Sequence, residues 1–264
     1  MRFTTGDLTP RWRRTVENLE RFLYYPERIP GDAPLPYWAR GAQEIWVTTE
    51  DGVKVHGLWW DEPAGAPVVL FFHGNAQDVF QWSPVHDELA PLECRMLLMD
   101  YPGYGKSEGE PSEKALYSDG RAALQWLRDN GVDDGDIVVF GKSLGGAVAC
   151  GVCPGLTLRG LVLESTFTSL LAVSKDLFPF MQGELPSEDV YHSAARIKDI
   201  HCPVLVVHGD ADALIPVSEG LELFEAANEP KELVIVRGAG HNDVSLVGGE
   251  AYAAHIRQWL DTTG

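Results

Sequence analysis

Short, nearly continuous runs of apolar residues recur along most of the chain, and longer stretches with helical spacing separate them. Such runs are typical of strands that helices cover on both faces, as in a parallel sheet. Two earlier segments, residues 43–49 and 53–60, flank Glu50-Asp51-Gly52 and predict a β-hairpin with Asp-Gly at its turn. The six later strands are predicted at residues 68–72, 96–99, 137–140, 161–163, 204–207 and 233–236.

Helix candidates alternate with these strands. They cover residues 112–130, 143–152, 218–227 and 244–260, and Gly248-Gly249 interrupts the last of them. Alternation of strand and helix predicts a mostly parallel, doubly wound sheet, here with the antiparallel hairpin at one edge. The 264 residues are expected to form a single α/β domain.

Two segments depart from this alternation. About residues 10–24 predict an amphipathic helix, because Trp12, Val16, Leu19 and Leu23 recur at helical spacing and arginines lie largely off that stripe. Such a helix can lie on a membrane surface, but docking on its own domain is the interpretation we favour. About residues 169–200 contain no predicted strand and are expected to form a short lid over the strand ends.

The charge of the chain excludes one class of partner. It carries 21 basic and 39 acidic residues, a formal net charge of −18, which repels phosphate backbones. We therefore expect no nucleic-acid partner. No stretch approaches the roughly 20 apolar residues of a membrane span, and the N-terminus lacks the apolar core of a signal peptide. A cytoplasmic location is expected.

The four cysteines do not form a recognisable disulfide framework at this length. Cys150 and Cys153 make a C-x-x-C pair without a second pair to complete a zinc site, and small buried side chains on one helix are the favoured interpretation. We expect neither a metal nor an organic cofactor.

The segment VVFGKSLGGAVACG, residues 138–151, admits two chemistries. A phosphate-binding loop requires a glycine five residues before Gly141, and that position is Asp136, which would repel phosphate. The alternative is the G-x-S-x-G turn that exposes a nucleophilic serine between a strand and a helix. A predicted strand precedes Ser143, a helix follows it, and small residues flank it, so Ser143 is the candidate nucleophile.

A serine hydroxyl requires a base, and that base requires an orienting acid. His241 lies in a glycine-containing loop directly after the last predicted strand, where it can reach the strand ends. Asp210 and Asp212 follow another strand, and on spacing alone either can serve as the acid. Glu164 is a further candidate, although holding neighbouring loops by hydrogen bonds is its favoured role. The order serine, acid, histidine is that of α/β-hydrolases.

Several motifs together resemble the α/β-hydrolase superfamily, over about residues 22–260. Within it the chain is similar to a small-lidded branch of serine hydrolases whose members include protein depalmitoylases and lipid esterases. The segments that carry the resemblance are Tyr24-Tyr25-Pro26-Glu27, Phe71-Phe72-His73-Gly74-Asn75-Ala76, Asp100-Tyr101-Pro102-Gly103-Tyr104-Gly105-Lys106-Ser107, residues 141–146, Glu164-Ser165-Thr166-Phe167-Thr168-Ser169, His208-Gly209-Asp210-Ala211-Asp212 and Gly240-His241-Asn242-Asp243.

The resemblance implies an α/β-hydrolase fold and a role for several residues. It selects Asp212 over Asp210, and it implies an oxyanion hole formed by the backbone N–H groups of Asn75 and Leu144. Many relatives carry a hydrophobic membrane anchor before the Tyr-Pro segment, where this chain has the arginine-rich helix.

The expected activity is hydrolysis of small carboxylic esters, with short to medium acyl chains favoured because the lid is short. Phe80, Phe178, Phe180 and Met181 are expected to line the acyl pocket. A thioesterase, depalmitoylase or peptidase with the same triad is the alternative. A binding protein without catalysis is disfavoured, because all three catalytic positions are filled. The oligomeric state is open.

Overall fold

One eight-stranded sheet organises the computed structural model, which describes residues 23–177 and 190–263. The strand order is β1-β2-β4-β3-β5-β6-β7-β8. Strand β2 is antiparallel to both β1 and β4, and every later neighbouring pair is parallel. The strands are β1 Gln43–Thr48, β2 Lys54–Trp60, β3 Val68–Phe72, β4 Arg95–Met99, β5 Ile137–Lys142, β6 Gly160–Glu164, β7 Val204–Gly209 and β8 Lys231–Val236.

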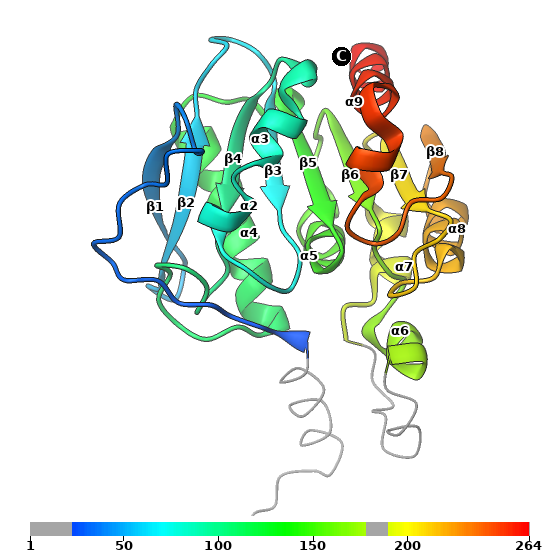
Figure 1. Cartoon of the computed structure of the whole chain (residues 1–264), viewed down its shortest axis with the longest axis horizontal. Helices are drawn as coiled ribbons and strands as arrows, with labels where there is room; N and C mark the ends of the chain where they lie inside the picture. Colours follow the sequence, from blue (N-terminus) through cyan, green and yellow to red (C-terminus); the bar gives the residue numbers. More distant parts are fainter. Residues whose placement is uncertain (1–22, 178–189, 264) are drawn as a thin grey trace, which may run out of the picture.

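Helices cover both faces of the sheet, with α2, α3 and α9 in front of it in the view of Figure 1. The α-helices are α2 Val79–Trp82, α3 Val85–Glu88, α4 Glu113–Asp129, α5 Leu144–Val152, α6 Leu170–Leu177, α7 Ser193–Arg196, α8 Val217–Ala226 and α9 Val244–Thr262. Short 3-10 turns are η1 Ala90–Leu92, η2 Asp134–Asp136 and η4 Ile197–Asp199.

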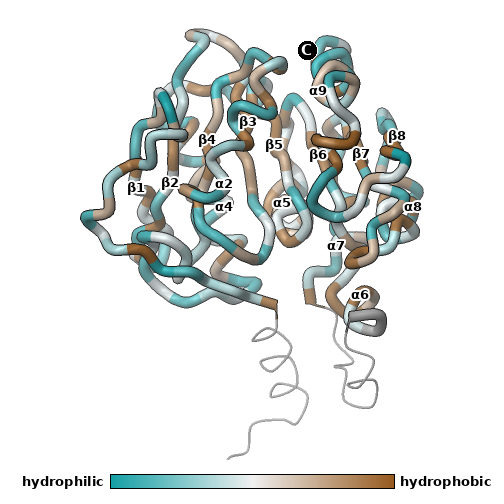
Figure 2. The backbone as a smooth tube through the Cα atoms, in the orientation of Figure 1, coloured by the Kyte–Doolittle hydropathy of each residue, from teal (hydrophilic) through white to brown (hydrophobic). Residues whose placement is uncertain are grey.

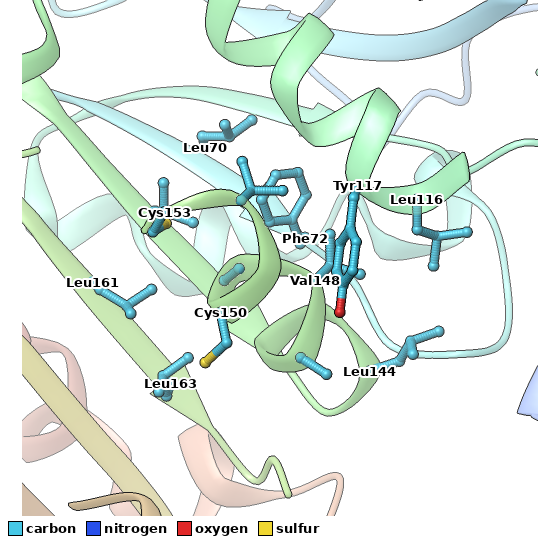
Figure 3. Packing of buried hydrophobic residues seen from close by; sticks show 14 of the residues in the cluster. Leu70, Phe72, Leu116, Tyr117, Leu144, Val148, Cys150, Cys153, Leu161 and Leu163 are labelled. Atoms are coloured by element: carbon cyan, nitrogen blue, oxygen red, sulfur yellow. The ribbon is translucent and has the colours of Figure 1, made fainter. Parts of the chain in front are cut away.

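The sheet separates two hydrophobic cores. Along β5, Val139 packs with residues of α4, α5 and α8, whereas Val138 and Phe140 pack with residues of α2, α3 and α9. Apolar residues on both faces explain the continuous runs in the sequence, which Figure 2 shows as brown segments along the central strands. Figure 3 shows the first core, in which Cys150 and Cys153 are buried as small apolar side chains.

The predicted hairpin, parallel strands and main helices are confirmed, with differences at their ends. Strand β5 extends to Lys142 and β7 to Gly209, because a glycine and a polar residue in each continue the hydrogen-bonded ladder after the apolar run stops. Helix α9 continues past the predicted interruption, where Gly249 has φ 55° and ψ −144° and kinks it. No helix of the described residues combines the length and apolarity that crossing a bilayer requires.

Parts of two predicted segments lie outside the described residues. Of the N-terminal helix expected over about residues 10–24, only Leu23 and Tyr24 are described, and both are buried in the first core. Of the lid expected over about residues 169–200, the described parts contain α6, α7 and η4. The predicted pocket residues Phe178, Phe180 and Met181 lie outside the described residues.

Candidate active site

Ser143 lies between the end of β5 and the first residue of α5, in a backbone conformation that few side-chain-bearing residues adopt. Its φ is 55° and its ψ −120°. Such a conformation typically costs about 1–3 kcal/mol and persists only where neighbours enforce it. Here the Ser143 N–H donates to the Glu164 carbonyl at 2.9 Å, and its carbonyl accepts from the Thr166 hydroxyl at 2.7 Å.

Three glycines make this turn sterically possible. A Cβ on Gly145 would lie 1.9 Å from the Phe72 carbonyl oxygen, and one on Gly141 would lie 2.4 Å from the Gly145 carbonyl oxygen. A Cβ on Gly146 would meet the Thr166 side chain at 2.5 Å. Strand β5 and helix α5 can therefore approach closely enough to form the turn only without side chains at these positions.

Two loops bring a histidine and a carboxylate to Ser143. The His241 Nε2 atom lies 3.0 Å from the Ser143 hydroxyl oxygen, and its Nδ1 atom lies 2.8 Å from Asp212 Oδ2. His241 follows β8 and Asp212 follows β7, so the carboxyl ends of three parallel strands supply the three groups. Ser143 and Asp212 are each 8% exposed. With Nδ1–H donating to Asp212, Nε2 is free to accept the serine proton.

The Asp212 carboxylate is fixed and ionised. Its Oδ1 atom accepts hydrogen bonds from the backbone N–H groups of Leu214 at 2.9 Å and Ile215 at 2.8 Å. Burial alone would raise the pKa of Asp212, but hydrogen bonds from His208 and His241 outweigh burial and hold the pKa below its ordinary value. A permanent negative charge thus faces the imidazole.

The other two candidate acids have different partners. Asp210 accepts a hydrogen bond from the Gly238 N–H at 2.6 Å and is exposed. Glu164 accepts hydrogen bonds from Lys142 at 2.8 Å and from the Tyr252 hydroxyl. Of the three candidate acids, only Asp212 contacts His241.

A cavity of about 560 Å³ opens beside Ser143. Its lining includes residues of helices α2 and α3, the loop of His241, and Tyr252 of α9. Gly74 and Asn75 also line it, and a Cβ on Gly74 would lie 3.8 Å from the Ser143 Cβ, so the loop after β3 passes close to the serine. Within the described residues, the backbone N–H groups of Asn75 and Leu144 donate no hydrogen bond.

Buried aromatic residues hold this loop from beneath. The Tyr101 hydroxyl donates to the His73 carbonyl, and the Tyr104 hydroxyl donates to the Asn75 carbonyl, both at 2.7 Å. The His73 Nδ1–H donates to the Gly74 carbonyl at 2.7 Å. Burial lowers the pKa of His73 to about 4, so this imidazole is neutral at pH 7. Sequence reasoning assigned no role to the two tyrosines, although both lie in the quoted Asp100–Ser107 motif.

One predicted pocket residue is corrected by the structure. Phe80 is buried in the second core, with its ring 5.7 Å from the His56 ring and 5.0 Å from the Lys106 ammonium, and it does not line the cavity. Successive residues of a helix turn by about 100°, so a residue two positions along faces another direction. Trp82 is that residue, and it lines the cavity.

Comparison with known proteins places the chain in a family. A model described as the α/β hydrolase fold matches residues 67–155, and a model of the prolyl oligopeptidase family matches residues 112–263. An uncharacterised protein of Mycobacterium tuberculosis is 37% identical over 92% of this chain and 87% of its own length. The human alpha/beta hydrolase domain-containing protein 17B is 35% identical over 75% of this chain and 67% of its own length. The chain belongs to the α/β-hydrolase superfamily.

Solved structures of α/β hydrolases share the fold. An esterase of Pyrococcus furiosus superposes with a TM-score of 0.74 at 24% identity, covering 90% of this chain and 99% of that one. An esterase from a Rhodococcus species superposes with a TM-score of 0.64 at 19% identity, covering 85% of this chain and 100% of that one. This α/β hydrolase therefore shares the architecture of these two esterases. Its membership of the family makes hydrolysis its class of reaction.

Proposed function

We propose that this α/β hydrolase is a serine hydrolase that cleaves carboxylic esters through an acyl-enzyme on Ser143. The observation that carries the proposal is the chain of contacts from the Ser143 hydroxyl to His241 Nε2 and from His241 Nδ1 to Asp212. An isolated serine is a poor nucleophile, and a hydrogen-bonded base with an oriented tautomer is what activates it.

The first half of the reaction forms the acyl-enzyme. As the Ser143 Oγ attacks the ester carbonyl carbon, its proton moves to His241 Nε2, and Asp212 stabilises the resulting imidazolium. The backbone N–H groups of Asn75 and Leu144 stabilise the negative charge that develops on the carbonyl oxygen. When the tetrahedral intermediate collapses, the bond to the leaving oxygen breaks and His241 returns the proton to that oxygen, which departs as the alcohol.

Water completes the cycle. His241 takes a proton from a water molecule while the water oxygen attacks the acyl carbon bound to Ser143. The second tetrahedral intermediate expels Ser143, which regains its proton, and the carboxylic acid leaves. No other group is needed to balance the reaction.

The favoured substrates carry short to medium acyl chains. The cavity beside Ser143 has about 560 Å³ and is lined partly by polar side chains, which suits a small acyl group better than a long alkyl chain. A rate series over p-nitrophenyl esters from acetate to palmitate measures this directly. We expect kcat/KM to be highest between acetate and octanoate, and a maximum at palmitate would contradict the expectation.

Labelling with a fluorophosphonate probe tests the mechanism. The native chain should bind the probe covalently, and Ser143→Ala should neither bind it nor hydrolyse p-nitrophenyl butyrate above background. Ser165→Ala provides the matched control, because Ser165 is a buried serine close in sequence that no catalytic role involves. A native chain that is folded but not labelled would falsify the mechanism.

A peptidase or thioesterase is the second candidate. The match to the prolyl oligopeptidase family over residues 112–263 favours amide cleavage, and the same acyl-enzyme chemistry serves either leaving group. Comparing one acyl group as its p-nitrophenyl ester, its thioester and its p-nitroanilide distinguishes the three. We expect the rate enhancement over the uncatalysed reaction to be largest for the ester.

A further inference from the structure

A charged pair lines the cavity, next to the proposed nucleophile. The Lys142 ammonium is 2.8 Å from Glu164 Oε1, with the two side chains 10% and 2% exposed. The Tyr252 hydroxyl donates to the other oxygen, Glu164 Oε2. All three residues line the cavity together with Ser143. The proposed acyl transfer assigns none of them a role.

The pair is neutral as a whole but unequal in its hydrogen bonding. Both Glu164 oxygens have donors, whereas Lys142 can donate three hydrogen bonds and, within the described chain, donates only to Glu164. Its Nζ atom also lies 5.9 Å from the centre of the Trp82 ring, on the cavity wall. Burial alone would lower the pKa of Lys142, but the Glu164 carboxylate outweighs burial and raises the pKa above its ordinary value. An ammonium with unused donors therefore faces the cavity.

We propose that Lys142 determines specificity by binding an uncharged oxygen acceptor, such as a carbonyl, on the acyl arm of the substrate beyond the scissile bond. The proposal rests on the proposed serine-hydrolase function and narrows its substrates. They are esters whose acyl arm carries a second polar oxygen, rather than plain alkyl esters.

Two alternatives fit the cavity less well. An alkyl chain against Lys142 would remove water from the ammonium without replacing its hydrogen bonds, which is unfavourable. An anionic acyl arm would meet an unfavourable charge balance, because Lys142 is the one cation among the described lining residues, whereas Glu88 and Glu164 are carboxylates. A neutral acceptor supplies the missing hydrogen bond without adding a third negative charge.

Three p-nitrophenyl esters of equal acyl length separate these cases. The heptanoate ends in an alkyl chain, the 6-oxoheptanoate has a ketone oxygen at its sixth carbon, and the adipate monoester has a carboxylate there. A hydrogen bond to a charged donor typically changes affinity by about tenfold or more. We expect kcat/KM for the 6-oxoheptanoate to exceed that for the heptanoate by about tenfold, with the adipate monoester below the ketone.

The decisive variant is Lys142→Met with Glu164→Gln. Removing Lys142 alone would leave Glu164 buried and unpaired, which is strongly destabilising, whereas the double variant removes both charges and leaves an amide oxygen for Tyr252. It should be folded by thermal unfolding, bind the fluorophosphonate probe, and lose the ketone preference so that the ratio of the two kcat/KM values falls to about one. Tyr252→Phe is the matched control, because it removes a hydrogen bond from the same cluster, keeps the Lys142–Glu164 pair and should keep the ketone preference.

The outcomes separate this inference from the proposed function. A native chain that neither binds the probe nor cleaves any of the three esters overturns both. A labelled chain that prefers the heptanoate, or a folded double variant with an unchanged ketone preference, overturns the role of Lys142 and leaves the serine mechanism standing. An equal loss of rate on all three esters in the double variant also overturns it, because that result indicates a structural role.

Discussion

The strained backbone of Ser143 is the single-residue feature on which the site depends. Its positive φ points the hydroxyl away from the helix that begins at the next residue and toward His241. The hydrogen bonds of its N–H and carbonyl to Glu164 and Thr166 offset the strain, because the conformation persists only where neighbours enforce it. The end of β6 and the residues that follow it therefore hold the proposed nucleophile in this geometry.

At the same scale, replacing the proposed orienting acid, Asp212, is expected to lower the catalytic rate strongly. Asp212→Asn should lower kcat for p-nitrophenyl butyrate by about 10³–10⁴, because the amide no longer holds His241 in the tautomer that accepts the serine proton. Asp210→Asn is the matched control and should stay within a few fold of the native rate. A comparable loss in both variants, measured by steady-state kinetics, would contradict the assignment of Asp212.

Asp119 makes stability depend on pH. It is a buried carboxyl of α4, its Oδ2 atom has no hydrogen-bond partner in the described chain, and burial raises its pKa to about 9. An unfolded Asp has a pKa of about 3.9, so between about pH 4 and pH 9 the folded chain holds a proton that the unfolded chain has released. The free energy of unfolding therefore falls as pH rises through this window.

The neutral variant Asp119→Asn should remove that dependence. We expect its Tm to exceed the native Tm by several degrees at pH 8 and by clearly less at pH 5, measured by thermal unfolding at both pH values. Asp129→Asn, at an exposed position of the same helix, should shift Tm little at either pH. A Tm gain for Asp119→Asn that is equal at pH 5 and pH 8 would mean that the carboxyl does not titrate as described.

At the scale of the element, the contact between β5, its turn and α5 depends on glycine. Gly145→Ala should abolish both fluorophosphonate labelling and soluble folding, because its Cβ would overlap the Phe72 carbonyl. Gly135→Ala is the matched control, because a Cβ there meets nothing within 4 Å and its backbone needs no positive φ. Circular dichroism and labelling of both variants check the expectation, and a folded, labelled Gly145→Ala would refute it.

At the scale of the whole molecule, one sheet joins two cores. Leu70 lies in the core of α4, α5 and α8, whereas Leu205 lies in the core of α2, α3 and α9. Leu70→Ala and Leu205→Ala should each lower the free energy of unfolding by about 2–5 kcal/mol, through lost burial and the cavity left behind. Because both cores share the strands, each variant should shift a single urea transition rather than split it.

An exposed leucine provides the control for both variants. Leu246 is 81% exposed, so Leu246→Ala should change the free energy of unfolding by no more than about 0.5 kcal/mol. Two separate urea transitions in either core variant would show that the two faces unfold independently.

Much of this protein follows from its sequence alone, because its main signals are local. The apolar runs predict buried parallel strands, and Gly141, Ser143 and Gly145 predict a sharp turn, since steric exclusion acts over a few residues. The choice of Asp212 over Asp210 did not follow from spacing and depended on resemblance, because both carboxylates lie within the same loop.

Only the tertiary structure placed the residues that no local pattern connects. Whether Phe80 or Trp82 faces the cavity depends on how a short helix packs on the sheet. Glu164 meets both Lys142 and Tyr252 because neighbouring strands and α9 bring together side chains that lie 22 and 88 positions apart in the sequence. Burial then keeps Asp119 protonated and His73 neutral at pH 7, since solvent is removed by the whole fold rather than by neighbours in sequence. Hydrogen bonds from His208 and His241, which the fold brings to Asp212, keep that carboxylate ionised.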